Sequence, residues 1–475
     1  MSFPRRNTLK PNPWYDAIVR TALPATVLAW AGGCCDKPEA PSPEVAPAVS
    51  RPVAAPRGGA TTVVARPTGE TAAYRTGTPD PRAVAVPADL QKGVLREPQR
   101  YLAKLVQHLI QGQTTDLGRA KALHDWIALN IRYDVEGFLS GALPSGRWED
   151  TLQKGQSVCE GYASLFERMC SLAELTCAKV SGYARGYGYD PFAPTEDSKS
   201  NHAWNAVQAN GSWYLIDPTW DSGHIRGRAW VAEYGTDYLF LDPLAFLHTH
   251  LPTESKWQLL TPARTREEFG QLPFIRGGFF ASGLILRTPV RRFSPADGSA
   301  AVEIDVPAGL TVSAQVAKAG GDPIDGCSFA QKEGAGTQLL ARFPSAGDYL
   351  LRVFVAQPGA KVGWEAAELA FRSRSGVSDR FPKVFSTFDE KQCHLYAPMT
   401  SKLAAGEVVH FKIRVHDARV VKLRDSADRW TPMVRSGSDP DIYEADLAAP
   451  KDPFKIMVNE GSGEQMFMGL LEFQG

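Results

Sequence analysis

Three residues of reactive type, Cys159, His202 and Asp217, follow one another in an order that suits acyl-transfer chemistry. A thiolate attacks the carbonyl carbon of an amide, an imidazole moves the proton, and a carboxylate fixes the tautomer and the charge of that imidazole. The three residues are far apart along the chain, so they form a site only if the fold brings them together. The local sequence predicts that it does.

Cys159 lies at the expected start of a helix. Apolar side chains such as Ala163, Phe166 and Met169 follow it at three- and four-residue steps, which is typical of an amphipathic helix. At a helix N-terminus, unpaired backbone N–H groups and the helix dipole favour a negative charge, and therefore the thiolate form. The N–H group of Cys159 itself would also stabilise the oxyanion formed by the attack.

His202 and Asp217 are expected on a β-hairpin. The runs HAWNAVQ and SWYLID alternate as strands do, and Asn210-Gly211 between them favours a type I′ turn. Closing this turn places Trp204 opposite Asp217, and His202 shares the face of Trp204 by two-residue alternation. His202 and Asp217 are then diagonal neighbours, roughly 7–8 Å apart at Cα and within side-chain reach.

These motifs together resemble the transglutaminase-like branch of the papain-like fold. The resemblance is carried by GQSVCEGYASLF, NHAWN and WYLIDPTWD, and the flanks DLGRAKALHDWIALNIRYD and YLFLDPLAFLHTHLPTESKWQLL narrow it to the kyphoscoliosis peptidase group. It implies an α+β domain with N-terminal helices, the cysteine on a helix, and the histidine and aspartate on an antiparallel sheet.

The resemblance implies a cysteine peptidase or a transglutaminase-like enzyme that acts on protein or peptide amide bonds through a thioester. The same groups include members thought to act mainly as scaffolds, so a non-catalytic module that binds proteins or peptides is the alternative.

Two upstream residues are further oxyanion candidates implied by the resemblance. Gln153 precedes Cys159 by six residues, the spacing at which papain-like enzymes place an oxyanion glutamine. Trp148 stands where animal transglutaminases use a tryptophan near the oxyanion, and a packing role is its alternative. The polar loop from Tyr187 to Ser200 precedes His202 and is expected to shape a substrate cleft.

Other polar residues are interpreted as structural. We expect His124 and Asp125, on a helix that begins near Thr115, to be solvated or at the edge of the core. His248 and His250 would share a strand face, but no nearby Cys, Asp or Glu completes a metal ligand set at familiar spacing. We therefore expect packing residues there, and neither a metal nor a cofactor.

The cysteine count is too low for a disulfide scaffold, since seven cysteines are spread over 475 residues. Cys170 and Cys177 are close enough in sequence to pair, and Cys327 with Cys393 could link two C-terminal units. The alternative is that all four are small buried hydrophobic residues.

The N-terminus resembles an export signal. Residues 1–35 have a basic front, a short apolar stretch and the motif Ala-Gly-Gly before Cys34, as in a bacterial lipoprotein whose cysteine carries the lipid. An ordinary cleaved signal or a disordered tail is the alternative. Residues 36–87, rich in Pro, Ala and Gly, predict an extended tether. We therefore expect an exported lipoprotein, anchored in a membrane and facing the periplasm or the cell surface.

Composition and strand pattern set the domain organisation. With 52 basic and 52 acidic residues the formal net charge is +0, which gives no support for nucleic-acid binding. We expect the transglutaminase-like domain over residues 88–275. Short alternating strands between Gly, Pro and Asp turns then predict two β-sandwiches, over residues 279–375 and 383–475.

Overall fold

The computed structural model describes most of the chain after residue 61. The described residues are 62–63, 69–87, 97–194, 199–334, 336–357, 360, 363–437, 439–459 and 466–474. The predicted export signal, the lipid site at Cys34 and the first part of the predicted tether lie outside them. Among the described residues, no helix combines the length and the apolar character needed to cross a membrane.

The first domain begins with helices that precede and follow the expected nucleophile. Thr115 caps one of them, accepting a hydrogen bond from the Gly118 N–H at 3.0 Å, as its side chain suits. The helical elements of this domain are η1 (Ala72–Tyr74), α1 (Pro81–Val84), α3 (Pro98–Ile110), α4 (Asp116–Asn130), α5 (Val135–Ser140), α6 (Trp148–Lys154), α7 (Cys159–Leu172), α8 (Pro243–Phe246), η2 (Ser255–Gln258) and α9 (Arg266–Gln271).

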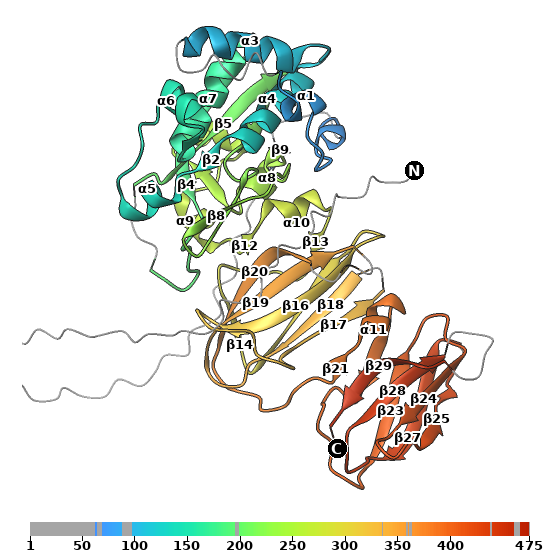
Figure 1. Ribbon diagram of the computed structural model, residues 1–475. Helices are drawn as coiled ribbons and strands as arrows, with labels where there is room; N and C mark the ends of the chain where they lie inside the picture. Colours follow the sequence, from blue (N-terminus) through green and yellow to red (C-terminus); the bar gives the residue numbers. More distant parts are fainter. Residues whose placement is uncertain are drawn as a thin grey trace, which may run out of the picture. The chain divides into compact units, whose positions relative to one another are not determined.

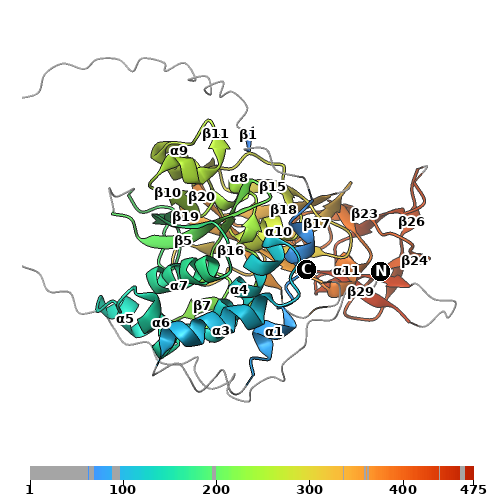
Figure 2. The same cartoon turned by 90° about the horizontal axis from the view of Figure 1, so that it is seen from above.

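An antiparallel five-stranded sheet in the order β10-β4-β5-β6-β9 forms the other half of this domain. Helices α4 and α7 pack on β5, and α3 packs on both helices (Figures 1 and 2). The strands of the domain are β1 (Thr62–Val63), β2 (Arg132–Tyr133), β3 (Gln156–Ser157), β4 (Cys177–Ala184), β5 (His202–Ala209), β6 (Ser212–Ile216), β7 (Gly223–Arg226), β8 (Ala229–Ala232), β9 (Leu239–Leu241), β10 (His250–Pro252) and β11 (Leu260–Thr261).

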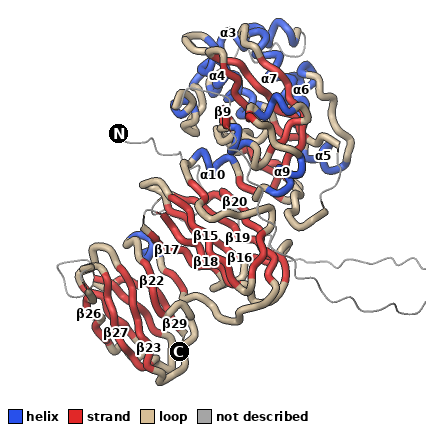
Figure 3. The backbone as a smooth tube through the Cα atoms, turned by 180° about the vertical axis from the view of Figure 1, so that it is seen from behind, coloured by secondary structure: helices blue, strands red, loops and turns tan. Residues whose placement is uncertain are grey.

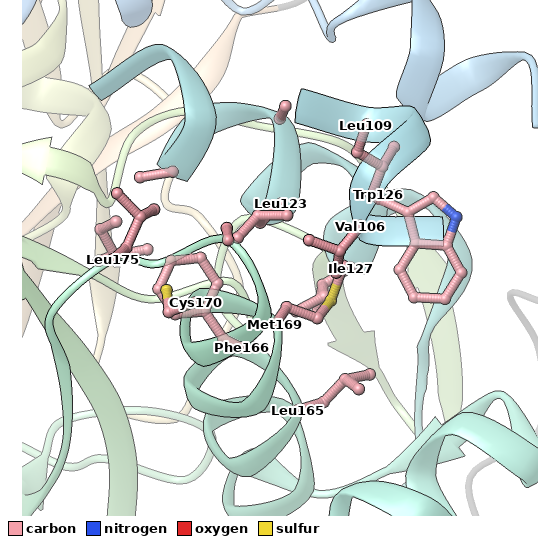
Figure 4. Close-up of a cluster of buried hydrophobic side chains, with 14 of the residues drawn as sticks. Val106, Leu109, Leu123, Trp126, Ile127, Leu165, Phe166, Met169, Cys170 and Leu175 are labelled. Carbon is pink, nitrogen blue, oxygen red and sulfur yellow. The ribbon is translucent and has the colours of Figure 1, made fainter. Parts of the chain in front are cut away.

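Apolar side chains from α3, α4 and α7 form the core that holds α7 in place (Figure 4). Leu109 from α3, Leu123 from α4 and Phe166 from α7 are each 0% exposed. Because such interiors are close-packed, this contact fixes the position of α7 and therefore of its first residue, Cys159.

Residues 69–87, here called the N-terminal strap, pack on the first domain, whereas the sequence predicted an extended tether up to residue 87. Glu70 accepts hydrogen bonds from Asn210 at 2.5 Å and from the Tyr214 hydroxyl at 2.8 Å. Ala83 on α1 is 1% exposed. Few large apolar residues suffice for docking here because hydrogen bonds to the domain hold the strap.

Two β-sandwiches follow, as the sequence predicted (Figure 3). The first pairs a sheet of order β12-β20-β19-β16, to which β14 adds, with a sheet of order β13-β15-β18-β17. Its elements are β12 (Phe274–Ile275), α10 (Gly277–Ala281), β13 (Ile285–Leu286), β14 (Ser294–Ala296), β15 (Ser299–Asp305), β16 (Thr311–Lys318), β17 (Ser328–Glu333), β18 (Gly336–Arg342), β19 (Gly347–Ala356) and β20 (Trp364–Ser373). Because β12 pairs with β20, this sandwich starts before residue 279, where we expected its boundary.

The second sandwich has sheets of order β21-β29-β28-β24-β25 and β22-β23-β27-β26. Its elements are β21 (Lys383–Val384), α11 (Ser386–Glu390), β22 (His394–Ala397), β23 (Val408–Arg414), β24 (Val420–Arg424), β25 (Trp430–Pro432), β26 (Val434–Arg435), β27 (Ile442–Ala448), β28 (Phe454–Asn459) and β29 (Met468–Phe473).

The cysteines of the described residues carry free thiols. Cys170, Cys327 and Cys393 are buried, and Cys177 is half-buried. Three of these four cysteines are therefore small buried side chains, which was the alternative to pairing. Neither the Cys170–Cys177 nor the Cys327–Cys393 disulfide is formed.

A matched pair of substitutions on α4 tests this packing. Leu123→Ala, in the core, should lower the unfolding free energy of the first domain by about 2–5 kcal/mol because it leaves a cavity. Leu129→Ala, 40% exposed on the same helix, should change it by about 0.5 kcal/mol or less. Urea denaturation followed by tryptophan fluorescence measures both, and equal losses would contradict the described core.

Candidate active site

Cys159 is the first residue of α7, as the sequence predicted. Val158 before it is extended (φ −96°, ψ 178°) and is the N-cap. The approach is held by a short parallel pairing of β2 with β3, in which Tyr133 pairs with Ser157. The Cys159 N–H therefore belongs to the first helical turn, where N–H groups have no intrahelical acceptor.

The predicted hairpin is present with the predicted register. Asn210 and Gly211 have φ of 48° and 78°, the left-handed conformations that a type I′ turn requires. Ala209 pairs with Ser212, and the ladder continues to Asn205 opposite Ile216.

This register brings the His202 and Asp217 side chains into contact. Nε2 of His202 lies 2.7 Å from Oδ2 of Asp217, and both side chains are nearly removed from solvent. Nδ1 is then the ring nitrogen of His202 left to face Cys159, whose side chain hydrogen-bonds His202. Cys159 itself is a partly exposed residue.

Charge at the site is set by competition between burial and the neighbouring groups. Burial alone would lower the pKa of His202, but the charges of Asp217 and Cys159 and the hydrogen bonds to both raise it to about 10. Burial alone would raise the pKa of Asp217, but His202 and His250 hold it well below its usual range. At neutral pH the pair is therefore an imidazolium beside a carboxylate, which is the state that stabilises a thiolate at Cys159.

His250 is a further member of the site that the sequence analysis assigned to packing alone. Its Nε2 lies 3.2 Å from Oδ2 of Asp217, and its Nδ1 lies 2.8 Å from the Thr249 hydroxyl. Burial outweighs Asp217 and lowers the pKa of His250 to about 4, so the ring is neutral and its Nε2–H donates to the carboxylate. Its neighbour His248 instead contacts the Pro273 carbonyl through Nδ1, at 3.1 Å.

A glycine makes this approach of His250 to the hairpin feasible. Gly182 on β4 pairs with His202 on one side and Pro252 on the other. A Cβ at Gly182 would lie 2.4 Å from the Trp204 ring and 2.3 Å from the Leu251 carbonyl oxygen. The missing side chain therefore lets residues of β10 and β5 pack closely across β4.

His202, Asp217 and His250 are also near enough together to hold a metal ion, since one ligand atom of each lies within 4.8 Å of the others. Those same nitrogen atoms, however, donate hydrogen bonds to the carboxylate at 2.7 and 3.2 Å. A protonated His202 has no free lone pair for a metal. The arrangement is therefore better suited to holding a proton than to holding a cation.

Of the two upstream oxyanion candidates, Gln153 lies on the exposed side of α6. The turn that ends α6 at Gly155 lies between Gln153 and the strand leading to Cys159, and the oxyanion role of Gln153 stays a prediction. Trp148 is half-buried and packs against the core, with the Arg168 guanidinium 5.7 Å from its ring centroid. That is the packing role considered as its alternative.

His124 and Asp125 are fully buried, which corrects the expectation that they are solvated or at the edge of the core. Nδ1 of His124 lies 2.9 Å from Asp125, and Nε2 lies 3.0 Å from Asp221. Burial alone would lower the pKa of His124, but the two carboxylates raise it to about 9. A buried imidazolium between two carboxylates satisfies all three groups.

This buried ion network supports the loop that carries Asp217. Oδ1 of Asp221 accepts hydrogen bonds from the N–H groups of Asp237 and Tyr238, at 2.9 and 3.0 Å. The Tyr238 carbonyl in turn accepts the Asp217 N–H at 3.2 Å. The network thus positions the backbone of Asp217 from one side, while His202 and His250 hold its side chain from the other.

The N-terminal strap is attached to the same network. The Asp80 N–H donates to Oδ2 of Asp125 at 2.7 Å, and Lys121 bonds to both the Thr78 carbonyl and Asp125. The Tyr234 hydroxyl donates to Oδ1 of Asp125 at 2.7 Å. The strap is therefore connected to the loop of Asp217 through consecutive hydrogen bonds.

Comparison with known proteins agrees with this architecture. Residues 103–218 match the family model of the transglutaminase-like superfamily, and residues 266–368 match that of the KY-like, immunoglobulin-like domain. The chain therefore has a transglutaminase-like domain followed by an immunoglobulin-like domain, and these two domains are similar to those of the kyphoscoliosis peptidase-like group that the sequence motifs indicated.

Three individual relatives show how much of the chain this similarity covers. Kyphoscoliosis peptidase of Homo sapiens is 33% identical over 207 residues, which cover 43% of this chain and 31% of the relative. The Mus musculus protein is 34% identical over 190 residues, covering 40% and 29%. Hillarin of Drosophila melanogaster is 32% identical over 207 residues, covering 40% and 25%. The chain thus spans less than a third of the length of these relatives.

The charge state of His202 can be tested by replacing Asp217. In the unchanged protein the His202 ring should titrate near pH 10, because Asp217 stabilises the imidazolium. Asp217→Asn should move the titration well below pH 10, because burial is then opposed only by the charge and the hydrogen bond of Cys159. NMR of the ring C–H protons measures both, with Asp446→Asn, at an exposed carboxylate, as the control. An unmoved titration in Asp217→Asn would contradict the assigned pair.

The buried ion network should make stability depend on pH in a defined direction. The pKa of His124 is raised from 6.5 to about 9 in the folded state, so its stabilisation is complete below pH 6.5 and is lost as pH rises through 9. His124→Asn should lower the unfolding free energy at pH 7 by about 3–5 kcal/mol, and the difference from the unchanged protein should shrink by pH 10.

Urea denaturation at the two pH values measures this difference. His410→Asn, at a half-exposed histidine of the second sandwich, is the matched control and should leave the first domain unchanged. A difference that stayed constant between pH 7 and pH 10 would show that His124 is not an imidazolium.

Proposed function

We propose that the chain is a cysteine-dependent acyl-transfer enzyme that acts on protein or peptide amide bonds through a thioester. The observation that carries this proposal is the His202 ring, which is held by Asp217 through Nε2 at 2.7 Å and leaves Nδ1 for the sulfur of Cys159. A histidine that transfers a proton to or from a thiol needs this orientation toward the sulfur.

In this mechanism the Cys159 thiolate attacks the amide carbonyl carbon, and the His202 imidazolium gives its proton to the departing amine. The backbone N–H of Cys159, in the first turn of α7, stabilises the oxyanion of the tetrahedral intermediate. His202, now neutral, then takes a proton from the incoming water or amine, which releases the acyl group. Water gives a peptidase and an amine gives a transglutaminase-like product.

Asp217 and His250 act on this cycle indirectly. Asp217 stabilises the imidazolium and fixes the ring, and the neutral His250 holds the carboxylate from the β10 side. This second hydrogen bond keeps Asp217 aligned during the steps in which His202 has lost its proton.

The second candidate function is that of a non-catalytic scaffold that binds proteins or peptides. The immunoglobulin-like domain favours it, because β-sandwiches of this kind offer a surface for binding proteins. In either case we propose a protein or peptide as the partner. We further propose that Cys34 carries a lipid and that the folded domains face the periplasm or the cell surface. The support for this location is the sequence pattern of residues 1–35 and 36–68.

Product analysis distinguishes the candidates. The unchanged protein and Cys159→Ala are incubated with a mixed peptide library and a primary amine, and masses are read for cleavage or amine incorporation. We expect one of these products with the unchanged protein and none with Cys159→Ala. Asp217→Asn should reduce turnover on the order of 10⁴-fold.

Thiol labelling serves as the second measurement. Iodoacetamide should modify Cys159 quickly near neutral pH, and His202→Ala should slow that modification, with peptide mapping to separate Cys159 from the half-buried Cys177. Equal labelling rates in the unchanged protein and in His202→Ala, together with an unchanged peptide library, would favour the non-catalytic scaffold.

A further inference from the structure

Four aromatic side chains from separate segments contact one another in sequence, with Tyr133 among them beside Cys159, and a fifth ring lies beside His202. They are Trp230 on β8, Tyr133 on β2, Phe138 on α5, Tyr187 in the loop after β4, and Trp220 after the hairpin, and we call them the aromatic arc. The proposed catalytic steps use none of them.

One end of the aromatic arc lies beside Cys159. Tyr133 pairs with Ser157, two residues before the cysteine. Its ring is also 6.5 Å from that of Tyr162, and Tyr162 lies one helical turn from Cys159 on the same face of α7. Burial and then the charge of Cys159 raise the pKa of Tyr133 well above its usual range, which agrees with this proximity.

The rings then contact one another in sequence. Tyr133 lies 5.6 Å from Trp230 and 5.7 Å from Phe138, and Phe138 lies 6.2 Å from Tyr187, all measured between ring centroids. The first of these contacts joins β2 to β8, two strands that lie near each other in the fold.

The other end lies beside His202. Trp220 has its ring centroid 5.6 Å from that of His202. A Cβ placed on Gly186 would be 3.3 Å from the Trp220 ring, and Gly186 immediately precedes Tyr187. The arc therefore runs from the nucleophile side to the imidazole side of the same pair.

Exposure separates the aromatic arc from the core. Tyr187 is 54% exposed and the other four rings are half-buried, whereas Trp204 and Tyr162, which also flank the site, are 0% exposed. A half-exposed cluster of large rings keeps apolar surface in water unless something covers it. The Tyr187 hydroxyl is held by the Gly227 carbonyl at 3.2 Å, so the ring is kept in this position.

We propose that the aromatic arc is the site that binds an aromatic or large apolar side chain of the peptide substrate, close to the reacting amide. The proposal rests on the proposed function, since the occupant is the acyl donor whose amide lies at Cys159. Continuity with Cys159 and His202 selects this occupant, because Tyr133 lies beside the sulfur that attacks the amide and Trp220 beside the imidazole. Because aromatic and large apolar side chains stack on aromatic faces, the arc should prefer them to small or charged side chains.

The test compares peptides that differ only in one residue beside the reacting amide, which is Phe, Leu, Ala or Asp. The full chain should turn over the Phe and Leu peptides about tenfold or more faster in kcat/KM than the Asp peptide. Tyr187→Ala should reduce the preference for Phe over Ala about threefold to tenfold. Tyr187→Phe keeps the ring and should preserve it within about twofold.

Tyr396→Ala is the matched control, because Tyr396 is 39% exposed on the second sandwich. It should leave the preference unchanged. A Tyr187→Ala protein with unaltered preference would overturn the proposal.

A binding measurement separates the proposed enzyme function from the proposed aromatic arc. The same peptides are labelled, and their binding to the Cys159→Ala protein is followed by fluorescence anisotropy. Turnover without side-chain preference would overturn the aromatic arc and leave the proposed function. Selective binding of the Phe peptide that Tyr187→Ala abolishes, without any turnover in the unchanged protein, would support the arc and reject the enzyme. The absence of both would overturn both.

Discussion

The buried carboxylate of Asp217 is the group on which the site depends. A carboxylate removed from water costs several kcal/mol unless it is paired and hydrogen-bonded. Asp217 is 0% exposed, and it accepts from His202 and His250 through Oδ2 and from the Thr219 and Trp220 N–H groups through Oδ1. Because these donors come from β5, β10 and the loop after β6, the carboxylate constrains three segments at once.

The two histidines at this carboxylate have opposite charge states for a physical reason. His202 contacts both Asp217 and the sulfur, so charge interactions outweigh burial and its pKa rises to about 10. His250 has the longer bond to the carboxylate and the charge of His202 beside it, so burial prevails and its pKa falls to about 4. One carboxylate therefore holds one cation and one neutral donor, without placing two positive charges side by side.

Asp221, four residues after Asp217, is a second buried carboxylate with a histidine partner. It pairs with His124 and holds the backbone at Asp237 and Tyr238. Through Asp125 the same network reaches the N-terminal strap. Polar networks of this kind specify one arrangement, because any partial arrangement leaves a buried charge unpaired. The loop between the two aspartates also carries Trp220, so the ring that lies 5.6 Å from His202 is positioned by the same bonds.

The sequence by itself determined the parts of the site that are set by local geometry. Cys159 starts a helix because apolar periodicity begins there, and His202 meets Asp217 because Asn210-Gly211 fixes the hairpin register. The two β-sandwiches followed from alternation and turn residues in the same way.

Only the tertiary structure decided the rest, because contacts between segments distant in sequence leave no local pattern. His250 reaches Asp217 through the pairing of β10 with β4, and Gly182 makes the close approach possible. His124 is buried between Asp125 on its own helix and Asp221, and no sequence pattern indicated that Asp221, 97 residues away, would meet it. Gln153 matched a spacing, but the turn at Gly155 left it in solvent. The strap looked like a tether because its apolar content is low, yet hydrogen bonds to Asp125, Asn210 and Tyr214 dock it on the domain.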